Sequence, residues 1–487
     1  MAEEIGTDRV DKPSNSGTNP RKLLGSGSIY ALASIAPILS TLLITPVVTR
    51  ALGAADYGIV AVSVTLYQLG GVLLSLGLPA AITRHAIVAR SGVAGATALV
   101  AFGTLASLVA GGLLIAGIPI WGHLVIGPEH AWLLAWPVVS SIGLSMLALS
   151  QSLLRAVNKV LSFVTLSCVA AILGPGLGLL SVSLLDPSAN GFLTGLATGH
   201  ALAGLASLLI VLRIARPKFS WHEIKANLRI GWPTLPHSVA MSLLLTILVI
   251  VAAKTVGLED AGRLQLALLL GTAPLILLGA FNNSWAPMIY RTNDAQRAAV
   301  LSDTLRAIAV LVFVLVAGFC VLAEPVVSFI AGPALFNTDL LTASILVAAA
   351  TPFMALYLAN VHLVFLSGKT TPLAFTTPAS LAVSLVAVTA AAALFQTSSI
   401  VVFALGVVVF HSSQWVMSTF LSQRSGYGRP RIAPSLPPLG LAFALTVTTA
   451  ILLPSILVLL ITFVLIGILV IFSNRSVLRT HDAPTRG

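Results

Sequence analysis

Long apolar stretches dominate this chain, and each is about as long as a helix that crosses a lipid bilayer. Such a helix needs about 20 apolar residues. Fourteen stretches meet this length, near residues 26–48, 57–80, 94–120, 132–154, 160–185, 193–213, 230–253, 262–287, 300–323, 340–366, 371–394, 400–422, 436–453 and 455–473. Only 8% of the residues are charged, against about 25% in soluble domains. Because lipid leaves backbone polar groups without partners, the sequence predicts an all-α, polytopic membrane protein.

The charges of the connecting loops orient these spans. With the N-terminus in the cytoplasm, 23 of the 26 Lys and Arg residues fall in cytoplasmic segments, whereas the acids divide eight to seven. A bias of Lys and Arg without a bias of acids is the positive-inside pattern. We therefore expect a multi-pass protein of the cytoplasmic membrane with both termini in the cytoplasm. Because the cations are spread over these loops, no nucleic-acid partner is expected.

A short turn occurs twice. Arg50, Gly53, Asp56 and Gly58 follow the first span, and a cation, two glycines and an acid recur 204 residues later at Lys254, Gly257, Asp260 and Gly262. We interpret these eight residues as structural hairpin residues, in which Arg50 and Lys254 hold the turns by pairing with Asp56 and Asp260. A chain whose halves open with the same hairpin is expected to contain two related lobes.

The spans and loops predict the domain organisation. Two pseudo-symmetric lobes of six helices each are expected, with two further helices after them. The predicted divisions are a disordered cytoplasmic tail at 1–22, an N-terminal lobe at 23–213, a cytoplasmic linker at 214–229, a C-terminal lobe at 230–423, helices 13 and 14 at 424–474, and a cytoplasmic tail at 475–487.

The sequence carries no sign of catalysis. It lacks a phosphate-binding Walker A motif and a zinc-protease motif, and its acids lie at the edges of the spans. Cys168 and Cys320 are far apart within apolar runs, which suits buried residues better than metal ligands. We therefore predict no catalytic residues, no metal and no cofactor, and a protein that is not an enzyme.

A few polar residues near membrane depth are candidates for binding a substrate in a cavity: Arg84, Arg263, Arg291, His237, Asn282 and Asn283. Arginine suits an anionic headgroup because its planar fork donates two hydrogen bonds to phosphate. Arg84 and Arg291 are equally explained as anchors at span ends, and His237 as a hydrogen-bonded helix residue. Arg263 is harder to explain in that way, because it lies on the side that the charge rule leaves poor in cations.

The duplicated hairpins resemble a known family. The segment from Gly25 through Arg50 and Gly58 to Arg84, and the later segments Gly231–Ser238 and Ala280–Arg291, are similar to polysaccharide (O-antigen) flippases of the multidrug/oligosaccharidyl-lipid/polysaccharide superfamily. Relatives often carry an Asp-Arg pair where this chain has Leu248 and Val249. They also often have an aromatic residue two positions after the glycine that opens the eighth span, where this chain has Leu264.

The resemblance implies a transporter that flips a polyprenyl-diphosphate-linked oligosaccharide from the inner to the outer leaflet by alternating access. The expected partners are this lipid-linked oligosaccharide, membrane lipids, and a glycan polymerase or glycosyltransferases. Two alternatives stay open at this point. One is a cation-coupled small-molecule or drug antiporter of the same superfamily, which would usually have 12 spans and an acid at membrane depth. The other is a membrane polysaccharide polymerase or ligase, for which a large outer loop would be expected.

Overall fold

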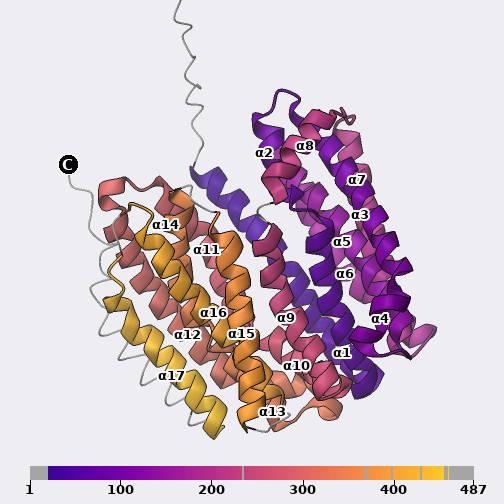
Figure 1. The fold of residues 1–487 in the computed structure, drawn as a ribbon, viewed down its shortest axis with the longest axis vertical. Helices are drawn as coiled ribbons and strands as arrows, with labels where there is room; N and C mark the ends of the chain where they lie inside the picture. Colours follow the sequence, from indigo (N-terminus) through magenta and orange to yellow (C-terminus); the bar gives the residue numbers. More distant parts are fainter. Residues whose placement is uncertain are drawn as a thin grey trace, which may run out of the picture.

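The computed structural model describes residues 20–232, 235–367, 371–395, 399–427, 430–453 and Leu459, and the regular elements in this part of the chain are all helices (Figure 1). The first half contains α1 (Pro20–Leu74), α2 (Leu78–Val88), α3 (Gly92–Ala116), α4 (Ile118–Ile126), η1 (Ala131–Leu134), α5 (Ala135–Ala156), α6 (Val160–Leu184), α7 (Ala189–Ile214) and α8 (Trp221–Gly231). The second contains α9 (Leu235–Thr255), α10 (Leu258–Gly271), α11 (Ala273–Arg291), α12 (Asp294–Leu335), α13 (Thr338–Ala348), α14 (Thr351–Leu366), α15 (Leu373–Phe395), α16 (Ile400–Gln423), η3 (Ala433–Ser435) and α17 (Leu436–Leu452).

The structure confirms the all-α membrane fold. Within the described ranges, 12 stretches are long and apolar enough to cross a membrane. This number differs from the predicted fourteen at the two ends of the chain. Helix α1 contains the first predicted span and most of the second, and from it only Leu43–Leu74 enters the count. The last predicted span, 455–473, lies outside the described residues apart from Leu459. The predicted tails lie outside them as well, except that α1 already begins at Pro20.

Four glycines turn the chain at one end of the bundle, which we call the hairpin end. Gly53 (φ 71°, ψ 178°) divides α1, Gly127 (φ 85°, ψ 165°) follows α4, Gly257 (φ 99°, ψ 166°) precedes α10, and Gly332 (φ 65°, ψ 177°) lies near the end of α12. Only glycine adopts this backbone conformation readily. The glycines form two pairs, 204 and 205 residues apart, so the repeat that the sequence shows at one hairpin extends to a second.

Two bundles stand side by side in Figure 1, with α2 to α8 in one and α11 to α17 in the other. The helices α1, α9 and α10 run between them, and α1 packs against α9, α10 and α12. Thr246 in α9 donates to the carbonyl of Thr65 in α1 (3.0 Å), and Thr49 in α1 donates to that of Ile330 in α12 (2.9 Å). The predicted residue boundaries of the two lobes stay a prediction.

Among the described residues, the apolar core is continuous between the bundles at one end. A large cluster joins the second half of the chain to residues of the first half near the hairpin end, such as Val48, Tyr57 and Phe192. At the opposite end, which we call the basic end, the first bundle has a core of its own around Leu78, Leu99 and Leu149. The bundles are therefore fastened to each other at the hairpin end, which leaves a cavity between that closure and the basic end.

Candidate functional site

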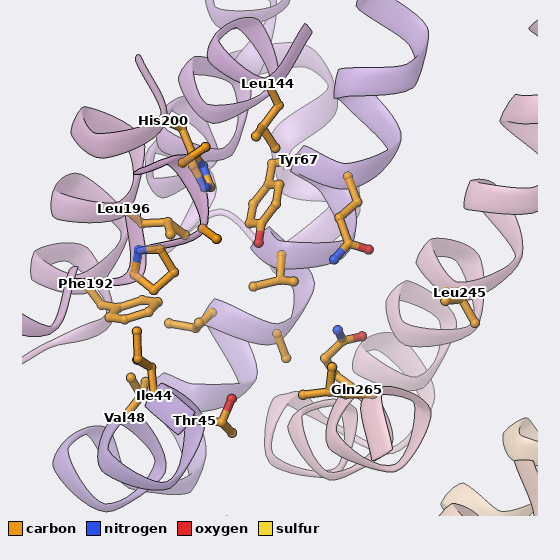
Figure 2. A pocket seen from close by; sticks show the side chains of 18 of the residues that line it. Ile44, Thr45, Val48, Tyr67, Leu144, Phe192, Leu196, His200, Leu245 and Gln265 are labelled. Atoms are coloured by element: carbon orange, nitrogen blue, oxygen red, sulfur yellow. The ribbon is translucent and has the colours of Figure 1, made fainter. Parts of the chain in front are cut away.

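A cavity of about 480 Å³ lies among α1, α5, α6, α7, α9 and α10 (Figure 2). Its volume falls within the range of small-molecule sites, roughly 300–1,000 Å³. Apolar side chains make most of the wall, among them Ile44, Phe192 and Leu245. The polar lining residues are all neutral amides, phenols, hydroxyls or imidazole: Thr45, Tyr57, Tyr67, Gln68, Gln151, Ser167, His200, Gln265 and Thr272. Among the described residues, no Asp, Glu, Lys or Arg lines the cavity.

Close helix packing places His200 in the cavity wall. Helix α7 approaches α5 at Gly143, where an added Cβ would lie 2.3 Å from the His200 carbonyl oxygen. It approaches α6 at Gly174, where a Cβ would lie 2.7 Å from the His200 ring. Small residues allow helices in membranes to pack this closely. The imidazole therefore lies against the backbone of Gly174 on one side. On the other it faces the Tyr67 ring edge-on, with the ring centroids 5.2 Å apart (Figure 2).

Two polar atoms in this wall have no hydrogen-bond partner in the described part of the chain. They are Nδ1 of His200 and Oε1 of Gln265, and both are buried. A buried polar atom without a partner costs about 1–3 kcal/mol. By contrast, the Gln151 amide donates to Ser167 Oγ (2.9 Å) and is held in place. The cavity therefore combines fixed neutral groups with two free hydrogen-bonding positions, which a ligand or water can satisfy.

Arg263 lies away from this cavity. Its guanidinium pairs with Glu259 and with Asp260 (2.6 Å), and it donates to the Leu335 carbonyl (3.1 Å) at the end of α12. These partners tie the start of α10 to the turn that follows α12. Its position outside the cation-rich side thus has a structural explanation, and its predicted role in binding substrate stays a prediction.

The other predicted binding residues are dispersed. Arg84 is exposed on α2, and the His237 ring at the start of α9 hydrogen-bonds Thr377 in α15 (2.8 Å). Asn282 is half-buried in α11, and its Oδ1 is buried without a partner among the described residues. The side chains of Asn283 and Arg291 lie outside the described part. The structure does not bring Arg84, Arg263, His237 and Asn282 together, and none of these four lines the cavity.

The hairpin cations hold their turns through carbonyl groups. Arg50 donates to the carbonyls of Pro46 (2.6 Å) and Phe329 (2.7 Å) and lies over the Phe329 ring. Lys254 donates to the His123 carbonyl (3.1 Å). The expected pairing of these cations with Asp56 and Asp260 is wrong: Asp56 accepts from the amide of Ala189 (3.3 Å), and Asp260 pairs with Arg263. In the folded chain each acid bonds another donor, and each cation donates to a carbonyl of another helix, Arg50 to α12 and Lys254 to α4.

Several cavity residues were missed as candidates from the sequence. Tyr67, Gln151 and His200 belong to no local motif, and Tyr57 lies within the first hairpin but is not repeated in the second, where Ala261 stands. One signal was present, because Gly195, Gly199 and Gly204 flank His200 on α7 and mark a closely packed face.

Solved structures share this fold. The lipid II flippase MurJ in an inward closed conformation matches with a TM-score of 0.62 and 14% identity, over 92% of this chain and 99% of that one. An inward-facing multidrug-resistance transporter of the MATE family matches with a TM-score of 0.59 and 15% identity, over 81% of this chain and 97% of that one. A point mutant of the Vibrio cholerae MATE transporter VcmN matches with a TM-score of 0.57 and 16% identity, over 87% of this chain and 99% of that one. At these identities the likeness shows the fold alone.

The family follows from the sequence match. Among curated proteins, no relative matches this chain. A family model described as "Polysaccharide biosynthesis protein" matches residues 23–293, which is more than half of the 487 residues. This range takes in both duplicated hairpins and every lining residue of the cavity, from Ile44 to Ile276. The chain therefore belongs to the polysaccharide biosynthesis protein family, and it shares its fold with the solved structures named above.

Proposed function

We propose that the protein flips a polyprenyl-diphosphate-linked oligosaccharide from the inner to the outer leaflet of the cytoplasmic membrane. The observation that carries the proposal is the neutral polar wall of the cavity. Sugar hydroxyls both donate and accept hydrogen bonds, and amides, phenols and imidazole do the same. The free atoms of His200 and Gln265 suit such a ligand, and the apolar remainder of the wall suits the hydrophobic faces of sugar rings.

The arrangement of the bundles supports alternating access. The core that joins the bundles at the hairpin end closes the cavity there, and opening it requires the bundles to part at α1 and α10. In this proposal the oligosaccharide crosses inside the protein, and the polyprenyl tail stays in the bilayer because its apolar surface is already out of water there. Glycosyltransferases would supply the substrate, and a glycan polymerase would consume it.

The main alternative is a cation-coupled drug antiporter. Such a protein needs a site for its ion, which in a membrane is commonly an acidic side chain at membrane depth. Among the described residues no acid lines the cavity, which favours the glycan substrate. The two functions differ in what is exported, so one experiment separates them.

The test is complementation of a bacterial strain that lacks its own flippase. We expect the wild-type chain to restore surface polysaccharide and to confer no export of cationic dyes. Gln265→Leu and Gln151→Leu each remove hydrogen bonds to sugar, worth about 1 kcal/mol apiece, so export should fall about fivefold. Gln423→Leu, at an exposed glutamine at the end of α16, is the matched control. Dye export without polysaccharide export would establish the antiporter and refute the proposal.

A further inference from the structure

The linker between the two bundles contains a short helix with a distinctive outer face. Helix α8 (Trp221–Gly231) buries Ile224 and Asn227 toward the protein. Trp221, Lys225 and Arg229 lie four residues apart and are all exposed, so they form one stripe along the opposite face. Trp232, directly after the helix, is 61% exposed and extends the stripe. We call these four residues the linker stripe.

A buried polar network fixes the inner face of α8. The Asn227 amide donates to Nδ1 of His85 in α2 (2.9 Å), so the Nε2 of His85 carries the proton and donates to Ser91 Oγ (2.8 Å). The Ser91 hydroxyl donates to the carboxylate of Glu223 (2.9 Å). A Cβ at Gly95 would lie 2.2 Å from Ser91 Oγ, so only glycine leaves room for this network. The orientation of α8 is therefore set by α2 and by the start of α3.

Because this network holds Glu223 on the inner side, the charged side chains on the outer face of α8 are cations. Glu223 is the only acid of α8, and its carboxylate is engaged by Ser91 on the inner side. The linker before the helix adds Arg216 and Lys218 and contributes no acid. Nothing on the linker stripe neutralises Lys225 and Arg229, since none of the ion pairs in the described part of the chain involves either residue.

The position of Trp221 places α8 at the membrane boundary. The Trp221 ring lies edge-on to that of Phe102, with their centroids 6.2 Å apart. Phe102 is the eleventh residue of α3, roughly 15 Å along that helix from its first residue. One turn further on, Leu105 is 62% exposed, as expected of a surface in contact with lipid. Exposed tryptophan beside such a surface is typical of the layer of lipid headgroups.

We propose that the linker stripe binds the headgroups of anionic phospholipids at the basic end of the bundle. Lys225 and Arg229 supply charge complementary to the lipid phosphate, while Trp221 and Trp232 sit among the headgroups at either end of the helix. The linker that joins the two bundles is thereby attached to the bilayer surface. This inference does not depend on which substrate the cavity carries.

The test measures which lipids surround α8 in the intact protein. Ala226, which is exposed beside the stripe, is changed to Cys in a chain carrying Cys168→Ala and Cys320→Ala, and a fluorophore is attached. The protein is placed in vesicles of phosphatidylcholine and phosphatidylglycerol, and one lipid or the other is brominated to quench the fluorophore. We expect brominated phosphatidylglycerol to quench about threefold or more over its share of the lipid, since each nearby cation favours anionic lipid several-fold.

Neutralising the stripe gives the decisive comparison. Lys225→Gln with Arg229→Gln should abolish the preference for phosphatidylglycerol, whereas Arg424→Gln with Arg431→Gln, at exposed cations elsewhere, should leave it unchanged. In the chain that keeps Lys225 and Arg229, a higher salt concentration should weaken the preference for phosphatidylglycerol, because salt screens exposed charge. Equal quenching by both lipids, no quenching by either, or a preference that survives both the double substitution and high salt would overturn the proposal.

Discussion

Gly58 and Gly262, which are 204 residues apart and equivalent in the internal repeat, pack against each other where the two halves of the chain meet. A Cβ on Gly262 would lie 3.2 Å from the Cα of Gly58, and one on Gly58 would lie 2.0 Å from the Leu258 carbonyl oxygen. The duplicated motif therefore places one glycine of each copy at a shared helix crossing. This crossing closes the cavity at the hairpin end.

Gly58→Ala should weaken that closure. The added methyl group overlaps backbone atoms that cannot rotate away, and overpacking of this kind costs about 1–3 kcal/mol. We expect a lower thermal unfolding temperature in detergent and reduced export in the complementation assay. Gly112→Ala, in α3 with open space around it, is the control and should change neither. If Gly58→Ala unfolded at the wild-type temperature, the two helices could move apart at this crossing without cost.

Gly174→Ala should disturb the cavity without unfolding the protein. The new methyl group meets the His200 ring at 2.7 Å and forces it to move. Export should therefore fall while membrane insertion and the elution profile are retained. Gly176→Ala lies on the same helix with nothing within 4 Å and should export normally. Equal export by the two variants would contradict a role for the position of His200.

Arg263→Ala distinguishes an anchor from a substrate ligand. Loss of its ion pairs and of the bond to Leu335 should lower stability by about 1 kcal/mol, because these pairs are partly exposed. Glu259→Gln should reproduce part of this loss, measured as thermal unfolding at low and high salt. A variant with unchanged unfolding and abolished export would instead support the predicted role in the substrate path.

At position 297, lysine should not take over the contacts of arginine, so Arg297→Lys should be less stable than the wild type. The guanidinium is 7% exposed, bonds the carbonyls of Ile289 (3.3 Å) and Thr292 (2.6 Å), pairs with Asp294, and lies 4.9 Å from the centre of the Tyr427 ring. Lysine lacks the planar fork that reaches all of these partners, so we expect a loss of about 2 kcal/mol in thermal or denaturant unfolding. Arg306→Lys, on the same helix, serves for comparison. Equal stability of the two variants would mean that the charge alone matters at Arg297.

Cysteine labelling tests the predicted orientation. Glu259→Cys lies at the hairpin end, where Glu259 is 51% exposed, and Arg424→Cys lies at the end of α16, toward the basic end. A membrane-impermeant maleimide added to intact cells should label the first and not the second, in a background without Cys168 and Cys320. The opposite pattern would place the basic end outside and refute the charge-based topology.

The hairpin motif shows how far sequence reasoning reaches. Gly53 and Gly257 were identified from their spacing, and both prove to have a backbone conformation that only glycine adopts readily. The relation between Gly127 and Gly332 is harder to find, because each is followed by a proline, Pro128 and Pro333, but no charged residue repeats beside this short Gly-Pro pair. The charge pattern draws attention to Arg263, yet its partner Leu335 is 72 residues away and cannot be inferred from the sequence.

The sequence by itself determined that this chain crosses a membrane many times as helices and opens each half with the same hairpin. Those properties follow from the length of apolar runs and from local residue spacing, which depend little on tertiary contacts. Only the tertiary structure decided which polar residues share a cavity. Gln68, Gln151, His200 and Gln265 come from four helices, and their meeting depends on how glycine-lined faces pack. The described part of the cavity wall is neutral, and a role for Arg84, Arg263 and Arg291 in binding substrate stays a prediction.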